Sequence, residues 1–558
     1  MKKFISFLLA LMLTALLLAS CGNSDEKSPD ETAAPSGSPA TEPVTEEPTA
    51  APAPGVPADI KIIPSSDKYR TYYQVWIGSF EDSNGDQIGD IPGLIQRLDY
   101  INDGDPDGGN DLGMDGIWLS PMMPSSTYHK YNIEDYFDID PQFGTLDDFD
   151  ALISACHDRG VVVIIDLVLN HSGAGHEFFI KACDELREGK EDGYAQYYNF
   201  SKTQDSTYKY NVSGTDYYYQ GDFWDQMPDW NLSYDGTRAY FEEVTKFWLD
   251  RGVDGFRLDA VKYFTDSHTD GKEFLNWFYT MAQGYKSDVY MVGEDWDDAG
   301  NVYDMYESGI DSLFNFKFAG SGNTYIQASH GRVSDLVTQL KKYGDNIKKR
   351  NANAINANFL TNHDMVRLAN LIDVEDNKFA AALYMLSPGN SFTYYGEEIG
   401  IEADNSNNDA YYRTAMIWDS ENLPEIYANG VGYVPEHELG GVKQQLPDQD
   451  SLLNTYRNLV RLRLQNPELV RGDITETVSY DGMYCAGYVV DYEGTRLMVI
   501  HNGDESAQTM SVNEIENPTV RGWVTAETFD DETAAVTLSG SFLTIPAKTS
   551  VILKENKN

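Results

Sequence analysis

Short apolar runs alternate with amphipathic stretches along most of the chain, and each run has the length of a buried strand. From Thr71 onward eight such runs follow one another, with helix-like segments such as Thr145–Arg159 and Tyr240–Arg251 between most of them. The runs are Tyr72–Ile77, Gly116–Pro121, Val161–His171, Gly252–Ala260, Val289–Asp295, Ser312–Phe316, Ile355–Asp364 and Ser391–Glu398. This alternation predicts an α/β fold, a closed (β/α)8 TIM barrel. A doubly wound open sheet is the alternative, but no Gly-rich phosphate turn supports it.

Four of these runs end in polar and charged side chains. The clusters are Asp166, Asn170 and His171; Arg257 and Asp259; Glu294; and Asn362, His363 and Asp364. A closed parallel barrel gathers the carboxyl ends of its strands at one rim, where such barrels carry their active sites. One polar strand end means little, but four in one chain predict a site at this rim.

Arg257 and Asp259 lie two residues apart in an apolar frame, so on a strand both side chains point to the same side. A guanidinium beside a carboxylate favours the anion, and a carboxylate that is ionised at neutral pH can act as a nucleophile. A structural salt bridge is the alternative for this pair taken alone. Glu294 has no adjacent cation in the sequence, so we expect desolvation to raise its pKa, as a general acid requires.

Four motifs, in chain order, carry a resemblance to a known family. They read Asp-Leu-Val-Leu-Asn-His from 166, Gly-Phe-Arg-Leu-Asp-Ala-Val-Lys-Tyr from 255, Gly-Glu-Asp from 293 and Phe-Leu-Thr-Asn-His-Asp from 359. From about Tyr72 to the C-terminus the chain resembles the α-amylase family of retaining glycoside hydrolases, glycoside hydrolase family 13. The resemblance implies a barrel with a subdomain inserted after its third strand, a C-terminal β-sandwich, and an α-glucan substrate such as starch or maltodextrin.

The resemblance also implies roles for individual residues. Asp259 would be the nucleophile, Glu294 the general acid/base, and Asp364 the carboxylate that binds sugar hydroxyls and steadies the transition state. Retaining hydrolysis requires such a pair, an ionised nucleophile and an acid that later becomes the base. The substrate-binding candidates lie at or near the polar strand ends and are Tyr131, His171, Arg257, His363, His129 and Lys262.

Two further stretches bear on the subgroup. Exo-glucosidases of the family usually carry Asp after the stacking tyrosine, whereas Asn132 follows Tyr131 here. Met227-Pro-Asp-Trp-Asn-Leu232 resembles the form in neopullulanases and in α-amylases intermediate between them and the oligo-1,6-glucosidases, with Trp230 in place of the usual Leu. Neopullulanases generally have an extra folded N-terminal domain that supports dimers, whereas we expect only a tether at that place in this chain. We therefore predict a monomeric, endo-acting α-amylase of the intermediate group. The alternatives are a neopullulanase or maltogenic amylase, an α-glucosidase, and a non-catalytic glucan-binding protein.

A separate motif indicates a metal. In Asp82-Ser-Asn-Gly-Asp-Gln-Ile-Gly-Asp90, oxygen-bearing side chains recur at every second position, and glycines let the loop curl around a hard cation. The bidentate Glu of an EF-hand is missing, because Gly93 stands at the twelfth position. Some α-amylase relatives bind calcium after their first strand. That resemblance implies a structural Ca²⁺ with the ligands Asp82, Asn84, Asp86, Asp90 and the Ile88 carbonyl. A metal-free acidic turn is the alternative.

The N-terminus has the pattern of a leader followed by a tether. Lys2 and Lys3 precede an apolar stretch from Phe4 to Ala19. This stretch is shorter than the roughly 20 residues that are needed to span a bilayer, so residues 1–20 are predicted to be a signal peptide. The ending Leu-Ala-Ser-Cys resembles a lipoprotein signal, which implies a lipid on Cys21 and an extracellular protein anchored to the membrane. Residues 21–67, rich in Pro, Glu, Ser and Thr, are expected to form a disordered tether.

The rest of the chain divides into three parts. The barrel is predicted over residues 68–171 and 232–466, an aromatic-rich inserted subdomain over 172–231, and a C-terminal β-sandwich of short alternating runs over 467–558. The sequence has 41 Lys and Arg against 89 Asp and Glu. This excess of acid argues against nucleic acid as a partner, because phosphate binding needs cationic patches.

Overall fold

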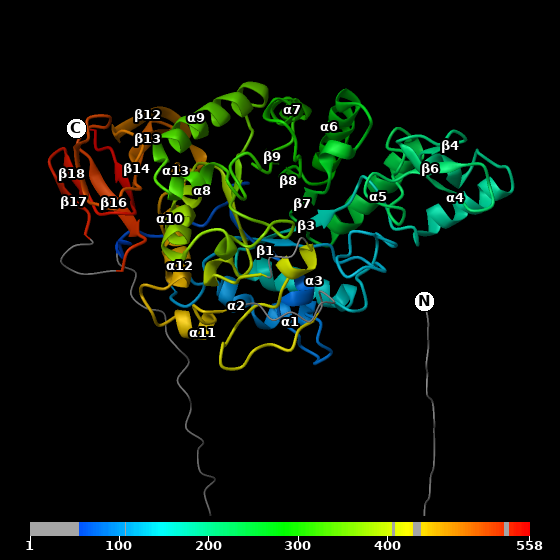
Figure 1. Ribbon diagram of the computed structural model, residues 1–558, viewed down its shortest axis with the longest axis horizontal. Coiled ribbons are helices and arrows are strands. Elements are labelled where there is room, and N and C mark those ends of the chain that lie inside the picture. The colour runs from blue at the N-terminus through cyan, green and yellow to red at the C-terminus, as the bar shows by residue number, and fades with distance from the viewer. Residues whose placement is uncertain (1–54, 107, 404–407, 428–436, 529–534, 558) are drawn as a thin grey trace, which may run out of the picture. The chain divides into compact units, whose positions relative to one another are not determined.

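The computed structural model describes residues 55–106, 108–403, 408–427, 437–528 and 535–557. Eight parallel strands form one sheet in the order β10-β11-β1-β2-β3-β7-β8-β9 (Figure 1). Their bounds are β1 Thr71–Val75, β2 Gly116–Leu119, β3 Val162–Leu167, β7 Gly255–Leu258, β8 Tyr290–Gly293, β9 Ser312–Leu313, β10 Ala357–Phe359 and β11 Asn390–Tyr394. A parallel bridge between Phe314 and Ala357 joins the two ends of the sheet. The sheet is therefore a closed barrel, which confirms the predicted fold class.

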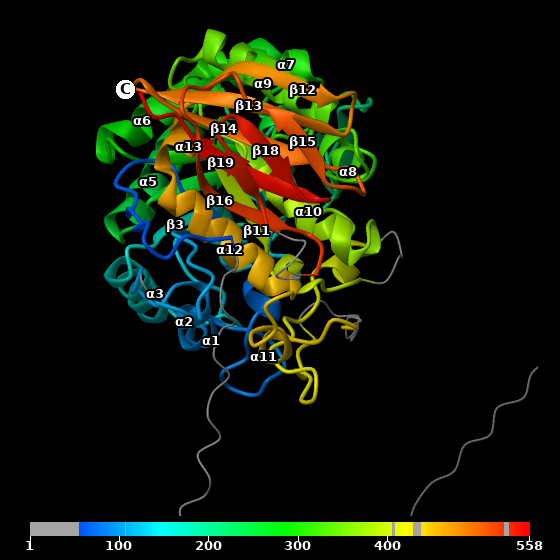
Figure 2. The same cartoon turned by 90° about the vertical axis from the view of Figure 1, so that its left-hand side faces the viewer.

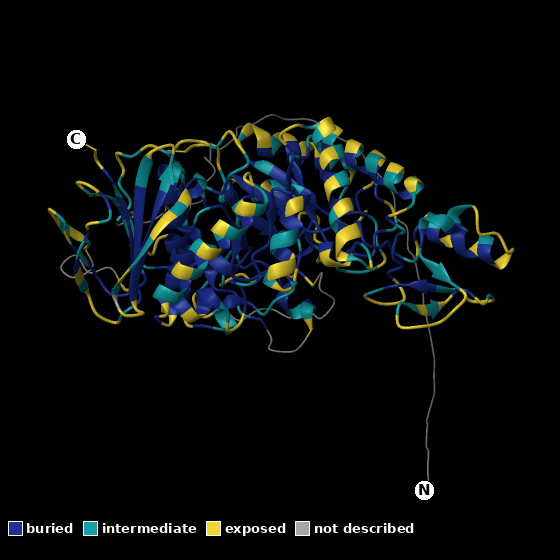
Figure 3. Cartoon of the chain, turned by 90° about the horizontal axis from the view of Figure 1, so that it is seen from above, coloured by how far each residue is buried: buried dark blue, intermediate teal, exposed yellow. Residues whose placement is uncertain are grey.

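Helices lie outside the strands and cover the barrel. They are α1 Ile91–Gln96, α2 Leu98–Ile101, α3 Leu146–Asp158, α5 Asp235–Asp250, α6 His268–Tyr285, α7 Ala299–Met305, α8 Thr324–Ser329, α9 Val333–Arg350, α10 Val374–Met385, α11 Val442–Gln445, α12 Leu452–Gln465 and α13 Pro467–Arg471. Figure 3 shows their outer faces exposed and the strands behind them buried. This amphipathic pattern is what a helix packed on a sheet requires.

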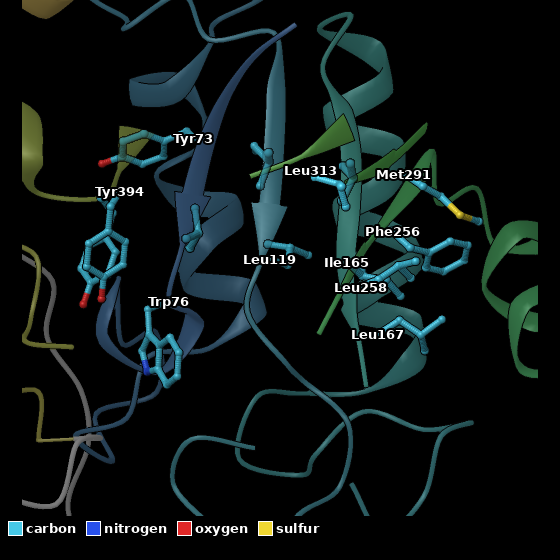
Figure 4. Packing of buried hydrophobic residues seen from close by; sticks show 14 of the residues in the cluster. Tyr73, Trp76, Leu119, Ile165, Leu167, Phe256, Leu258, Met291, Leu313 and Tyr394 are labelled. Atoms are coloured by element: carbon cyan, nitrogen blue, oxygen red, sulfur yellow. The ribbon is translucent and has the colours of Figure 1, made fainter. Parts of the chain in front are cut away.

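The barrel strands are buried on both faces, because successive side chains point alternately into the barrel and toward the helices. Aromatic rings fill the interior, and Tyr72 stacks on Phe392 with ring centroids 4.7 Å apart. Side chains such as Leu119 and Ile165 belong to a separate apolar cluster, the outer cluster, which packs between the strands and the helices (Figure 4). Since both strand neighbours of Arg257 belong to that outer cluster, the same alternation turns Arg257 inward.

An inserted subdomain lies between β3 and α5. It contains α4 Glu177–Arg187 and a small sheet of β4 Phe200–Ser201, β5 Tyr208–Asn211 and β6 Tyr218–Gln220. Trp230, from the motif that departs from the family pattern, is fully buried and stacks on Tyr198 with centroids 4.4 Å apart. Many of the aromatic residues here therefore form the core of the subdomain.

The C-terminal part consists of two antiparallel sheets, which Figure 2 shows nearest the viewer. The larger contains β12 Asp473–Asp481, β13 Cys485–Tyr492, β14 Thr495–Asn502, β16 Thr519–Thr525 and β19 Thr549–Lys554. The smaller contains β15 Gln508–Ser511, β17 Thr537–Ser539 and β18 Phe542–Ile545. One apolar cluster includes Val489 and Ile500 from the first sheet and Leu543 from the second. The two sheets thus share a core.

Residues 55–67, predicted as tether, lie against the folded domain instead. Gln465 Nε2 donates to the carbonyls of Pro57 and Ile60 at 2.9 and 2.8 Å, and Arg471 pairs with Asp67 at 2.7 Å. Composition does not predict these contacts because most of them use backbone carbonyls and charges rather than large apolar side chains. The predicted leader, Cys21 and the tether up to residue 54 lie outside the described residues. Within the described part, no helix is both long and apolar enough to cross a membrane.

Candidate active site

A cleft of about 660 Å³ opens at the rim formed by the carboxyl ends of the strands. Asp259 and Glu294 come directly after β7 and β8, and Asp364 follows β10. All three line the cleft, together with His129, Tyr131, His171, Phe223, Trp224, Met227, Ala260, Lys262, Tyr263, Trp296, Asp409 and Arg413. The structure thus brings three carboxylates from separate motifs into one site. A cavity of about 710 Å³ beneath residues 56–65 contains none of the predicted site residues.

The guanidinium of Arg257 is the centre of the site and is completely buried. Its Nη1 donates to Asp259 Oδ1 and to Asp166 Oδ1, both at 2.7 Å, and its Nη2 donates to Glu294 Oε2 at 2.6 Å. Asp166 lies opposite Arg257 in the register of β3 and β7. Charge-assisted bonds from one planar guanidinium therefore fix the positions of three carboxylates.

The contact between Arg257 and Glu294 corrects the expectation that Glu294 has no adjacent cation. Strands β7 and β8 are parallel neighbours in which Leu258 pairs with Gly293. The residues just beyond these strand ends are therefore neighbours in space, although they are far apart in the sequence. Spacing along a single strand cannot reveal such a partner.

Burial raises the pKa of both carboxyl groups that the reaction would use. The pKa of Asp259 rises to about 6 and that of Glu294 to about 7, because burial penalises the charged form and the Arg257 charge only partly offsets this. Arg257 therefore does not keep the pKa of Asp259 in its ordinary range, as the sequence suggested. Because the pKa of Asp259 is the lower of the two, Asp259 can be an ionised nucleophile while Glu294 is still a protonated acid. Ala260, whose N–H donates to Glu294 Oε2 at 3.1 Å, has a strained left-handed φ of 51°.

Asp364 is held as an anion on the other side of the cleft. Arg413 Nη2 lies 2.8 Å from its Oδ1 and His363 Nε2 lies 3.0 Å from its Oδ2. Although burial opposes ionisation, His363 and Arg413 hold the pKa of Asp364 well below its usual range. The hydroxyl of Tyr131 is 2.7 Å from the same His363 nitrogen, and the two rings are nearly parallel. Gln74 Nε2 lies 2.7 Å from His363 Nδ1, so this amide donor assigns the imidazole proton to Nε2.

The other predicted substrate-binding residues, His171, His129 and Lys262, also line the cleft. Burial lowers the pKa of His171 to about 3 and that of His129 to about 4, so both imidazoles are neutral near pH 7. His171 Nε2 is buried and has no hydrogen-bond partner among the described residues, which leaves it free to bond a ligand. Lys262 Nζ lies 3.3 Å from Asp297 Oδ1.

Several residues of the site were not assigned a role from the sequence. In the sequence, Asp166 belongs to a polar strand end. Alternation along the strand places its side chain on the same side as the buried Ile164, and this is the signal that could have identified it. Arg413 lies in a loop after β11, where neither periodicity nor spacing singles it out. Trp296 stands only two residues beyond Glu294, and that closeness to the acid is the signal that could have identified it.

The predicted calcium loop lies between β1 and α1, outside the cleft. Asp82 Oδ1 accepts from the N–H of Asn84 at 3.0 Å, Asp86 Oδ1 accepts from the N–H of Ile88 at 2.9 Å, and Asp90 caps α1. The donor set is all oxygen, which suits calcium. Among the described residues, however, no three Asp, Glu, His or Cys side chains converge on one point as a metal site. As folded here, the loop satisfies its carboxylates with backbone amides, and calcium binding stays a prediction.

Comparisons with known proteins agree with this geometry. The family model for the α-amylase catalytic domain matches residues 74–472. Alpha-amylase 3 of Dictyoglomus thermophilum is 32% identical over 454 residues, which cover 80% of this chain and 87% of the relative. An oligo-1,6-glucosidase of Halalkalibacterium halodurans is 27% identical and covers 78% and 90% respectively. The solved structure of Eubacterium rectale Amy13B matches with a TM-score of 0.83 at 37% identity, over 90% of this chain and 97% of that one. The chain therefore belongs to the α-amylase family of glycoside hydrolases.

Proposed function

We propose that this protein is an endo-acting α-amylase that hydrolyses α-1,4-glucosidic bonds of starch and malto-oligosaccharides with retention. The observation that carries the proposal is that one buried guanidinium, Arg257, holds both Asp259 and Glu294 in an open cleft. Asp259 attacks the anomeric carbon while Glu294 protonates the leaving oxygen. Glu294 then takes a proton from the water that breaks the glucosyl–Asp259 ester.

Support for endo action comes from Asn132. Its side chain is buried, donates to the Gln226 carbonyl at 3.0 Å and does not line the cleft. The position at which exo-glucosidases of the family carry Asp therefore presents no carboxylate to a terminal sugar. A neopullulanase, maltogenic amylase or α-glucosidase would use the same chemistry and is the second candidate, which the similarity to an oligo-1,6-glucosidase favours. A non-catalytic binding protein is disfavoured, because the cleft contains all three carboxylates.

The test is digestion of maltoheptaoside that is blocked at its non-reducing end, with products separated by chromatography. We expect cleavage inside the blocked chain by the wild type and none by Asp259→Asn. Release of glucose from the unblocked chain alone would identify an exo-glucosidase and refute the endo proposal.

A structural calcium in the Asp82–Asp90 loop is a second, separate proposal, supported by the all-oxygen donor set. A ligand that binds only the folded state stabilises it by about 2.7 kcal/mol at a hundredfold excess over its Kd. Calcium added to chelated protein should therefore raise the melting temperature, and Asp86→Asn should weaken that rise. Equal melting temperatures with and without calcium would contradict the proposal.

The N-terminal motif supports a third proposal, that the protein is exported and anchored to the membrane through a lipid on Cys21. The chain produced in a bacterial host should partition into the detergent phase of a Triton X-114 extract, and Cys21→Ser should move it to the aqueous phase. Identical partitioning of the two forms would count against lipidation.

A further inference from the structure

Within the described residues, Asn is followed by Gly at two places, 84–85 and 502–503. The side-chain amide of Asn can be attacked by the backbone nitrogen of the next residue, which closes a five-membered succinimide ring. Gly hinders this attack least, because it has no Cβ. The two places differ in exposure and in hydrogen bonding, and this difference decides which of them can react.

Asn84 lies in the exposed loop between β1 and α1. Gly85 has a left-handed φ of +82°, and a Cβ built on it would meet no protein atom within 4 Å. The loop therefore has room for the ring to form and for water to reach it.

A carboxylate stands at the proton that the Gly85 nitrogen must lose before it attacks. The N–H of Gly85 donates to Asp82 Oδ1 at 2.7 Å. The same side chain accepts from the N–H groups of Asn84 and Gln87, at 3.0 and 2.8 Å, so three bonds fix its position. A carboxylate within hydrogen-bond reach of the proton that it removes meets the geometric requirement for a general base.

A second backbone group activates the carbon that is attacked. The N–H of Asp86 donates to Asn84 Oδ1 at 2.9 Å. Attack on Cγ places negative charge on this oxygen, and a fixed N–H donor stabilises that charge, as the donors of an oxyanion hole do. Among the described residues, Asn84 Nδ2 donates only to Asp90 Oδ2, at 3.3 Å. The leaving nitrogen is therefore weakly held.

Asn502 has the opposite surroundings. It is completely buried in the C-terminal domain. Its Nδ2 donates to three backbone carbonyls, of which that of Pro546 is the nearest at 2.7 Å. The N–H of Gly503 donates to the Tyr484 carbonyl at 2.9 Å, and a carbonyl is not a base. Asn502 therefore lacks the base, the access to water and the weakly held leaving group.

We propose that Asn84 is a site of self-modification, at which the folded loop promotes loss of the side-chain amide. Asp82 takes the proton of the Gly85 nitrogen, and this nitrogen bonds Cγ of Asn84. The bond from Cγ to Nδ2 breaks, and the departing nitrogen takes up that proton and leaves as ammonia. Water then opens the ring at one of its two carbonyl carbons, which gives aspartate or isoaspartate at position 84.

Either product changes the loop for which calcium is proposed. Both add a negative charge between Asp82 and Asp86, and isoaspartate also adds a CH₂ group to the backbone. The reaction uses no residue of the catalytic cleft, so the inference does not depend on the proposed hydrolase function.

The test incubates the freshly purified full-length protein at mildly alkaline pH with a chelator present, which keeps metal out of the loop. Peptide mapping by mass spectrometry follows the conversion of each amide to an acid. We expect conversion at Asn84 and none at Asn502. Conversion at Asn84 should be about tenfold faster than in a synthetic peptide of residues 80–90, a small part of the about 10²–10⁴-fold that a general base supplies in an enzyme. A rate in the protein at or below that in the peptide would overturn the inference.

Two variants test the role of the base. Asp82→Ala should lower the rate at Asn84 to that of the peptide. Ser83→Ala is the matched control, because it loses a loop hydrogen bond to Asp90 Oδ2 at 2.8 Å but leaves Asp82 in place, and it should keep the wild-type rate. An unchanged rate in Asp82→Ala, or equal losses in both variants, would contradict the role of the Asp82 carboxylate.

Discussion

Replacing Glu294 by Gln should remove the alkaline limb of the pH profile and leave the acid limb in place. Burial raises the pKa of Asp259 to about 6 and that of Glu294 to about 7. The reactive form has an ionised Asp259 and a protonated Glu294, so the rate rises with pH through the first value and falls through the second. For the wild type this gives a maximum near pH ~6.5 and a fall of about twentyfold by pH ~8.5.

The assay measures initial rates against pH on maltoheptaose, which needs a general acid, and on α-maltotriosyl fluoride, which does not. Glu294→Gln should lower the rate on maltoheptaose by about 10²–10⁴-fold. With azide as a nucleophile that needs no base, the variant should still consume the fluoride, without an alkaline limb, because an amide does not titrate. The Gln oxygen can still accept from Arg257 and from the N–H of Ala260, so we expect the fold to survive, which circular dichroism checks.

An alkaline limb that persists in Glu294→Gln on the fluoride donor would refute the assignment of the second ionisation to Glu294. Asp364→Asn is the matched control, because the Asp364 carboxyl lies in the same cleft but has a pKa far below this range. That variant should lose rate on both donors and keep the alkaline limb on maltoheptaose, the donor that needs the general acid.

Three more predictions concern stability. Arg257→Leu leaves the buried Asp166 and Asp259 and the partly buried Glu294 without their cation and should cost about 3–5 kcal/mol in chemical denaturation. A loss below about 1 kcal/mol would contradict the stabilising role of Arg257. Burial raises the pKa of Glu397 from 4.5 to about 8, so the folded state keeps a proton that the unfolded chain releases and stability falls as pH rises between these values. Glu397→Gln should then show a smaller drop in melting temperature from about pH 5 to about pH 8, and an unchanged drop would argue against that ionisation. A Cβ at Gly55 would lie 2.3 Å from the Trp523 carbonyl oxygen at φ +78°, so Gly55→Val should release residues 55–60 to proteolysis. Gly189→Val, at φ +76° with open space, is its control, and equal protection of both variants would contradict the packing of this segment.

Local pattern determined much of this protein. Most barrel strands were predictable from their apolar runs, because burial on both faces favours consecutive apolar side chains. Alternation along β7 was enough to place Arg257 and Asp259 on the same side, and the closed barrel then gathered the polar strand ends at one rim. Residue type and position at the strand ends therefore indicated Asp259, Glu294 and Asp364 as candidates, and the resemblance to the α-amylase family supplied their roles.

Only the tertiary structure decided how these groups interact. The sequence gives no sign that Arg257 also binds Glu294, because that contact depends on the register between two strands. Arg413 reaches Asp364 from a loop that no periodicity marks, and Trp296 stacks on Phe316 from a segment that follows a different strand. Residues 55–67 have a polar composition but are held by Gln465 and Arg471. Burial raises the pKa of both reacting carboxyl groups. It depends on segments from the whole chain that pack around these groups, so it cannot be predicted from any short stretch of the sequence.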